Sequence, residues 1–552
     1  MASTALTSRV RARSRRRRGA VAGTVGAAAL ALVGAALPAP RAAGIGDPLF
    51  PHLGNPGYDV RAYDIAFDYG GDNSKPLTAR TSIDARVTAS TMDHFNLDFA
   101  AGDVRSVEVD GRPAQHARAG EDLVITPRTP LRRGDRLHVE VRHTSDPTTE
   151  NGGWVRTKDG LAMANQADAA HRVFPSNDHP ADKAMFTFHV RAPRTLTVVA
   201  GGLPMGKTRA GGRGEDTVWT YRMAHPMATE LAQVSIGRST VVRSAGPHGL
   251  PLRHVVPVKQ REKLQPWLDR TPRQISWLER HAGRYPFENY GILSAEAQTG
   301  FELETQTLSL FENDVFVSPD YPSWYKESLM VHELAHQWFG NSVTPHRWSD
   351  LWLNEGHATW YEWGYAAERG GFSVEERARA SYEQSDDWRK RYGPPAALLP
   401  ARTEGKIQLF SPIVYNGSAV VLYALRERIG KDAFARLERV WTHRYRDANA
   451  TTADFIALAG EVSGKDQSAF LKPWLYGKTT PPMPGHPDWK QKKPGKTRPT
   501  TGAGPAGTGA GPAGQVRPAR ARRRPRARAE PAHGPVLAPP GALPAVTDRK
   551  YG

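Results

Sequence analysis

The chain has 552 residues, enough for more than one domain, and a formal net charge of +18. Residues 1–42 hold eight arginines and no acid, and residues 490–552 hold 14 Lys and Arg against two acids, which leaves about −2 for the rest. The middle of the chain is therefore nearly neutral, and we expect no nucleic-acid partner. The absence of cysteine excludes a disulfide framework, a lipoprotein anchor and a Cys-ligated metal.

Residues 1–43 have the pattern of a signal peptide. An Arg-rich segment precedes an Ala/Gly/Val/Leu run at 20–37, which two prolines follow. A retained membrane anchor is the alternative, but the Ala and Gly content makes the run weakly hydrophobic. We expect cleavage between Ala36 and Ala43, by general export rather than the twin-arginine route. The mature protein would then be secreted, with no stable membrane span and with cell-wall association as an option.

Residues 44–246 are predicted to form an N-terminal antiparallel β-sandwich domain. Short runs that alternate apolar and polar residues, such as YDIAFDY at 63–69, are separated by Gly, Pro and Asp turns. In residues 247–490 the pattern becomes mainly α-helical, with a long amphipathic stretch at 258–284 and brief strand signals near Ile292 and Leu308. The predicted fold class is therefore α+β, with the β-sandwich first and the helical domain second.

The second domain carries the spacing of a hydrolytic zinc site. His332 and His336 lie at i and i+4 of a helix predicted over 325–339, so both imidazoles can reach one ion. Glu355, on a helix predicted over 351–368, would supply the third ligand and leave a fourth position for water. Glu333 is too near to chelate beside the histidines, and we expect it to be the base. HExxH alone occurs by chance on helices, but the downstream Asn-Glu-Gly favours one Zn²⁺ per chain.

These motifs resemble a known family. HELAHQWFGN at 332–341, followed by WSDLWLNEG at 348–356, is similar to the zinc aminopeptidases of the aminopeptidase N type, which include leukotriene A hydrolase. The resemblance extends from about residue 46 to 484 and implies a thermolysin-like catalytic domain over 247–490. Longer members continue with a large helical domain, so the resemblance is to a short secreted bacterial type with a more open cleft.

The resemblance also implies the residues that bind the substrate amine. The segment GFELET at 300–305 falls where the family has its Gly-Ala-Met-Glu-Asn strand, which assigns Glu304 to the free α-amino group. Gln166 matches the second amine-site residue by its distance from the Phe-Pro turn at 174–175. A carboxylate that pairs with the ammonium fixes how far the chain end enters, which makes a peptidase an exopeptidase.

This segment departs from the family pattern in several places, most notably at Glu302. Glu302 replaces the usual Ala, and strand alternation places it on the same face as Glu304. One hypothesis is that the additional negative charge favours basic residues near the substrate terminus, which makes Glu302 a specificity candidate. The alternative is that Glu302 pairs with a nearby Arg or Lys.

Two further residues complete the candidate site. Tyr415 lies near where the family has its catalytic tyrosine and would donate a hydrogen bond to the developing oxyanion, although Gly417 and Ser418 replace the usual Lys-Gly after it. A buried structural tyrosine is the alternative. Asp350 is expected either to orient a ligand or to cap the following helix.

The leading prediction is a secreted zinc aminopeptidase that acts on peptides through Glu333-assisted attack of a zinc-bound water. Glu304 argues against an endopeptidase on the same site, no residue calls specifically for epoxide hydrolysis, and the intact Glu333 argues against a non-catalytic peptide-binding protein. Residues 491–552 are predicted to be a disordered basic tail rich in Pro, Gly and Ala. We favour a solvated tail over weak contact of its arginines with an anionic cell surface.

Overall fold

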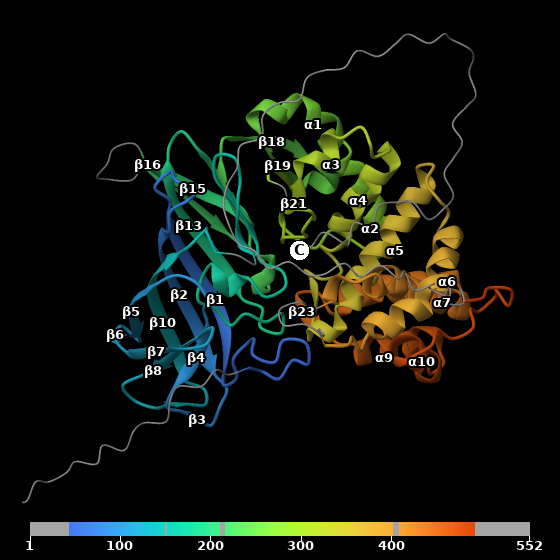
Figure 1. Cartoon of the computed structure of the whole chain (residues 1–552), viewed down its shortest axis with the longest axis horizontal. Helices are drawn as coiled ribbons and strands as arrows, with labels where there is room; N and C mark the ends of the chain where they lie inside the picture. Colours follow the sequence, from blue (N-terminus) through green and yellow to red (C-terminus); the bar gives the residue numbers. More distant parts are fainter. Residues whose placement is uncertain (1–43, 150–151, 210–215, 298, 401–407, 492–552) are drawn as a thin grey trace, which may run out of the picture. The chain divides into compact units, whose positions relative to one another are not determined.

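A computed structural model describes residues 44–149, 152–209, 216–297, 299–400 and 408–491. The predicted signal peptide, and the predicted tail apart from Gln491, lie outside these residues. All described residues belong to one unit, Pro40–Gly552. Strands dominate its first half and helices its second half (Figure 1), and the predicted α+β fold class is confirmed by the solved structures compared below.

An eight-stranded sheet forms the centre of the strand-rich part. Its outer face is partly solvated and its inner face is apolar, as the alternating burial of β1 (Tyr58–Asp68) shows. Neighbouring strands are antiparallel except for β1 and β13, which pair in parallel. The strand order is β15 (Leu203–Arg209), β16 (Asp216–Arg222), β13 (Met185–Pro193), β1, β2 (Leu77–Val87), β10 (Arg136–Ser145), β5 (Val104–Val109), β6 (Arg112–Pro113).

Smaller sheets complete this part and share its apolar core. They have the orders β11 (Gly153–Arg156), β12 (Leu161–Ala164), β17 (Val234–Gly237), β14 (Thr197–Ala200); β4 (Phe95–Asp98), β8 (Asp122–Thr126), β7 (Gln115–Ala119); and β3 (Thr91–Met92), β9 (Leu131–Arg132). Short strands with a shared buried face are the architecture of a sandwich. The loop that follows β12 carries Gln166.

The second part begins with another sheet and continues with helices. The sheet order is β18 (Ser239–Ala245), β19 (Pro251–Pro257), β20 (Ile292–Ala295), β21 (Ser309–Glu312), and β22 (Val343–Pro345) pairs with β23 (Ala448–Ala450). The helices are α1 (Arg261–Leu268), α2 (Thr271–Ala282), α3 (Asn313–Val317), α4 (Ser323–Ala335), α5 (Trp352–Glu368), α6 (Val374–Tyr392), α7 (Ser418–Ile429), α8 (Lys431–Arg444), α9 (Thr452–Ser463) and α10 (Ser468–Tyr476).

One helix prediction needs a correction. The amphipathic stretch predicted at 258–284 is divided into α1 and α2. Pro272 stands in the first turn of α2, where its missing N–H costs nothing and its fixed φ favours a helix start. A new helix therefore begins at Thr271.

Buried aromatic side chains fill the helical core. The fully buried tryptophans there are Trp338, Trp352, Trp363, Trp441 and Trp474. Within this core α4 and α5 pack against each other, which places their buried faces together. Among the described residues, no helix is both long and apolar enough to cross a membrane.

The segment before β1 is anchored at the junction of the two parts. The carboxylate of Asp47, which is 2% exposed, accepts hydrogen bonds from the Leu49 and Trp348 backbone N–H groups at 2.8 and 2.9 Å. It also lies 3.1 Å from the Nε2 atom of His179. Phe50 packs on Trp348 with ring centroids 5.5 Å apart. The start of the described chain is thus part of the buried structure.

Candidate metal centre

The three predicted metal ligands converge between α4 and α5. His332 lies in the last turn of α4, His336 follows its end, and Glu355 lies in the first turn of α5. The Glu355 Oε2 atom is 3.4 Å from the Nε2 atom of each histidine. One ligand atom from each residue can be chosen so that all lie within 4.8 Å of one another. Among the described residues this is the only such group of three.

This site suits a zinc ion. All three side chains are buried, and the Glu355 Oε2 atom accepts no hydrogen bond of ordinary geometry within the described part of the chain. A buried carboxylate oxygen in that state is costly unless a cation neutralises it. Two imidazoles and one carboxylate are the donor set of catalytic zinc sites. The residues present therefore fit the ion that the spacing predicts.

Outer contacts orient both imidazoles. The Nδ1 atom of His332 lies 3.1 Å from the Glu362 carboxylate, and the Nδ1 atom of His336 lies 3.1 Å from the Phe339 carbonyl oxygen. Both Nε2 atoms are left facing Glu355. Glu362 was not predicted from the sequence, although it lies seven residues after Glu355 and therefore on the same face of α5.

Asp350 does not orient a ligand. Its carboxylate accepts hydrogen bonds from the Thr452 hydroxyl at 2.6 Å and the Thr452 N–H at 3.2 Å. It supports the first turn of α9, whose N-cap is Thr451, and it does not cap the helix that directly follows it, so neither prediction for this residue is correct. Asp350 and Thr452 are 102 positions apart, and no local sequence pattern indicates that they pair.

The charges of the ligands reinforce one another. Burial opposes the charged form of His332, yet the pKa of His332 lies well above its usual value because the carboxylates of Glu355 and Glu362 lie beside it. Burial also opposes ionisation of Glu355, but His336 and His332 hold the pKa of Glu355 well below its usual value. Glu355 is therefore a carboxylate at neutral pH, as a metal ligand must be.

Glu333 lies buried beside the candidate ligands. It is 5% exposed, and its Oε2 atom has no hydrogen-bond partner among the described residues. Burial raises the pKa of Glu333 to about 8; Glu304 and Glu302 add to the rise, whereas His332 and His336 oppose it. A carboxylate whose pKa lies near neutrality can both take up and release a proton.

The two predicted amine-site residues are in contact. The Gln166 Nε2 atom donates a hydrogen bond of 2.6 Å to the Glu304 Oε1 atom, although the residues are 138 positions apart. Glu304 is 3% exposed, and its field raises the pKa of Glu333. Glu304 therefore lies close to the candidate metal centre.

Two amides that the sequence analysis did not single out hold the backbone of Glu304. The Glu304 carbonyl oxygen accepts hydrogen bonds from the Gln337 Nε2 atom at 3.1 Å and from the Asn341 Nδ2 atom at 2.6 Å. Both amides belong to the HELAHQWFGN motif. Polar residues at buried positions of that motif are the signal that could have found them.

Tyr415 lies against the metal ligands. It belongs to a π-helical turn, Ile413–Gly417, and its ring is 6.0 Å from the His332 ring at an interplanar angle of 16°. Burial raises the pKa of Tyr415 well above its usual value, and Glu355 and Glu304 raise it further. The phenol therefore keeps its proton and can act as a donor.

Gly356 permits the close approach that brings Tyr415 to the site. A Cβ atom added at Gly356 would lie 2.6 Å from the Cβ atom of Ser418, the first residue of α7. A larger residue would separate α5 from α7. This contact gives a physical reason for glycine after Glu355 in the motif.

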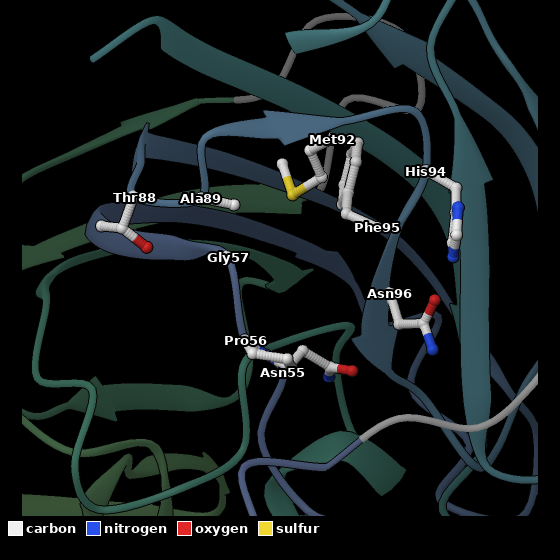
Figure 2. Close-up of a pocket in the computed structure, with 9 residues that line it drawn as sticks. All are labelled: Asn55, Pro56, Gly57, Thr88, Ala89, Met92, His94, Phe95 and Asn96. Carbon is white, nitrogen blue, oxygen red and sulfur yellow. The ribbon is translucent and has the colours of Figure 1, made fainter. Parts of the chain in front are cut away.

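A separate hollow of about 360 Å³ lies in the strand-rich part (Figure 2). Its lining residues are Asn55, Pro56, Gly57, Thr88, Ala89, Met92, His94, Phe95 and Asn96. None of the predicted site residues lines it, and it is not part of the candidate metal centre.

One protein-family model matches part of this chain, and the relatives described here are named aminopeptidases. Residues 267–474 match the peptidase family M1 domain. The chain is 27% identical to aminopeptidase N of Streptomyces lividans over 75% of this chain and 50% of the relative, and 23% identical to probable aminopeptidase 1 of Saccharolobus solfataricus over 78% and 54%. The chain thus spans about half the length of the curated relatives it matches.

Solved structures share the fold. An M1 zinc metallopeptidase from Deinococcus radiodurans aligns with a TM-score of 0.66 and 24% identity, covering 80% of this chain and 98% of its own. A mutant of it bound to a Tyr-Ser-Ala substrate aligns with a TM-score of 0.65 and 24% identity, over 80% and 99%. This likeness shows that the strand-rich and helical parts together share the fold of these two structures.

Proposed function

We propose that this chain, which carries a peptidase family M1 domain over residues 267–474, is a zinc aminopeptidase that releases amino-terminal residues from peptides. The observation that carries the proposal is the Gln166–Glu304 hydrogen bond of 2.6 Å beside the convergent His332, His336 and Glu355. A carboxylate held next to a metal centre can bind an ammonium group close to the bond that is cut. The named aminopeptidases among the relatives support the same activity.

The candidate ligands, Glu333 and Tyr415 would each have a separate role in the reaction. His332, His336 and Glu355 would hold one zinc ion, which when bound supplies a Lewis acid that polarises the scissile carbonyl and lowers the pKa of water. Glu333 takes a proton from the attacking water on its buried carboxylate and passes it to the leaving nitrogen. The protonated phenol of Tyr415 donates a hydrogen bond to the oxygen that becomes negative. That interaction is stronger in the transition state than in the substrate.

The amine site selects the substrate end. The Glu304 carboxylate neutralises the substrate ammonium through a charge-assisted hydrogen bond. Gln166 orients the carboxylate because its amide N–H is already committed to the Oε1 atom. An acetylated amino group has no charge to neutralise, and we expect the site to reject it. This requirement separates the proposed activity from the alternative of an endopeptidase.

The location and partners belong to the same proposal. The signal-peptide pattern at 1–43 supports secretion, and peptides outside the cell are then the substrates. The near-neutral middle of the chain supports a function without nucleic acid. A peptide-binding protein without catalysis is the second alternative, which the complete set of ligands and Glu333 argues against.

A fluorogenic assay tests the proposal. Zinc-loaded protein is given aminoacyl amides with free and acetylated amino groups, alongside Glu333→Ala and Glu304→Ala. We expect cleavage of the free substrates alone, with a loss of about 10²- to 10⁴-fold in Glu333→Ala because a general base contributes about that factor. Equal cleavage of acetylated substrates would show an endopeptidase, and no zinc-dependent cleavage would show a binding protein.

A further inference from the structure

The turn after the metal-binding helix is joined by two buried amides to the segment that carries Glu304, which is irregular apart from a single bridge at Leu303 and is not the strand expected from the sequence. Gln337 directly follows the ligand His336, and the backbone N–H of Asn341 donates to the His336 carbonyl oxygen at 3.0 Å. Both amide side chains are fully buried and donate to one atom, the Glu304 carbonyl oxygen, at 3.1 and 2.6 Å. The backbone of the amine-binding residue is therefore held from the segment that carries a metal ligand.

Gln337 holds the same segment at a second point. Its Oε1 atom accepts a hydrogen bond of 2.9 Å from the Thr307 N–H and one of 3.5 Å from the Tyr285 hydroxyl. Exchanging the amide oxygen and nitrogen would turn the amino group toward the Thr307 N–H and the oxygen toward the Glu304 carbonyl. The contacts therefore fix the orientation of the amide.

The backbone at the second of these points is strained. Thr307 has a φ of +66°, in the left-handed region that β-branched residues rarely adopt. Its N–H is held by Gln337, and its hydroxyl accepts a hydrogen bond of 2.8 Å from the Gly202 N–H. Such a conformation persists only where the surroundings determine it. Without the Gln337 amide, the turn that follows Glu304 loses one of these restraints.

We propose that Gln337 and Asn341 are positioning residues that fix the Glu304 backbone relative to the metal-binding histidines, and so set the register of the substrate amino terminus. The inference rests on the proposed aminopeptidase activity. Gln166 orients the Glu304 side chain, whereas Gln337 and Asn341 place its backbone. A displacement of about 1 Å at a binding group lowers rates by about 10²-fold. Loss of this register should therefore weaken recognition of the free amine before it affects metal binding.

The test compares Gln337→Met with Gln274→Met. Methionine keeps the approximate length of glutamine without the amide. Gln274 is a matched control because it is buried on α2 and its Nε2 atom donates at 3.2 Å to the Glu327 carbonyl oxygen on α4, far from the amine site in sequence. Asn341→Ala is the second test variant, because it removes one of the two bonds to Glu304 and keeps the Gln337 amide in place.

Three quantities are measured on the full chain: zinc per chain, KM and kcat for free and acetylated leucyl amides, and the calorimetric affinity for L-leucinamide. In Gln337→Met we expect wild-type zinc content, a KM for the free substrate and a Kd for L-leucinamide raised by about tenfold or more, and a smaller change in kcat. The ratio of kcat/KM for free over acetylated substrate should fall by a similar factor. In Gln274→Met that ratio and the L-leucinamide affinity should stay at their wild-type values.

The outcomes distinguish the positioning role of the two amides from the proposed aminopeptidase activity. An unchanged ratio and unchanged L-leucinamide affinity in both Gln337→Met and Asn341→Ala, in a protein that retains zinc, would show that the amides only stabilise the fold. A wild-type protein that cleaves acetylated and free substrates equally would instead overturn the proposed function, and the positioning role with it. If Gln337→Met does not fold, the same shift in Asn341→Ala alone supports the positioning role.

Discussion

Glu302 is the most notable departure of this chain from the family motif, and it lies close enough to Glu333 to influence its pKa. It is 7% exposed, and its carboxylate contributes to the raised pKa of Glu333. We expect Glu302→Ala to lower the preference for arginine over alanine at the substrate amino terminus by about fivefold, since an ionic contact of this kind contributes on the order of 1 kcal/mol. Kinetics with the two aminoacyl amides check this, and an unchanged preference would favour pairing of Glu302 within the protein.

Glu362 should tune metal affinity through His332. Its carboxylate lies 3.1 Å from the His332 Nδ1 atom, so it fixes the ring orientation and raises the basicity of the ligand. We expect Glu362→Gln to weaken zinc binding by about 10- to 100-fold. Competition with a chelator of known affinity measures this. Glu368→Gln is the control on the same helix, because Glu368 accepts a hydrogen bond from Trp277 rather than from a ligand.

The residues of the site differ in how far the sequence could predict them. His332, Glu333, His336 and Glu355 were predictable because helical spacing and one downstream motif carry the chemistry. Gln166 and Glu304 are 138 positions apart, so only the family resemblance could pair them. Glu362 could have been found from its i+7 spacing after Glu355, whereas the partners of Gln337 and Asn341 follow only from tertiary contacts.

At the scale of elements, the contact between α5 and α7 depends on Gly356. A Cβ atom there would lie 2.6 Å from the Ser418 Cβ atom, so Gly356→Ala should destabilise the protein by about 1–3 kcal/mol through overpacking. Urea unfolding measures the change. Gly460→Ala is the control, because its added Cβ atom would meet nothing closer than 3.4 Å inside α9. Equal stability of the two variants would contradict this account of Gly356.

Element types were predicted better than element boundaries and pairings. The expected helices at 325–339 and 351–368 correspond to α4 and α5, whose apolar periodicity is local. The parallel pairing of β1 with β13 was missed, because it joins residues more than 120 positions apart, such as Ala62 and Met185. Strand alternation specifies a buried face but not the partner strand.

At the scale of the whole molecule, buried acids between the two parts should make stability depend on pH. Burial raises the pKa of Glu230 to about 8, and Asp178 and Glu304 add to the rise while Lys183 opposes it. The folded protein therefore keeps a proton on Glu230 that the unfolded chain releases above its usual pKa of about 4.5. This group's contribution to stability then falls as pH rises from about 4.5 to 8.

Glu230→Gln removes that contribution. The wild type loses stability between pH 5 and pH 8 because its unfolded chain releases the Glu230 proton, whereas the variant has no such proton to release. We therefore expect the free energy of unfolding of the variant, relative to that of the wild type, to increase over this pH range. Urea unfolding at both pH values checks the sign. Glu375→Gln, at an exposed carboxylate, is the control. A difference between variant and wild type that does not vary with pH would contradict the assignment.

The two-part organisation was predictable from the change of periodicity along the chain, and the ordering of strands before helices followed from it. The contacts that hold the two parts together could not be predicted, because they join loops that are far apart in the sequence. The Lys183 Nζ atom, from the strand-rich part, donates to the Asn341 and Ser342 carbonyl oxygens at 2.9 Å each. Burial lowers the pKa of Lys183 to about 7, which no sequence pattern would indicate.

The buried position of Asp47 limits how far the amino terminus could be trimmed without disturbing the structure. Its buried carboxylate holds the backbone of Trp348, which opens the short turn leading to the helix of Glu355. Export processing between Ala36 and Ala43 would leave this anchor intact. Trimming by a few more residues would remove it and free the turn before the third metal ligand. If the chain is exported and processed as its sequence predicts, the position of the mature amino terminus would then bear on the candidate metal site as well as on export.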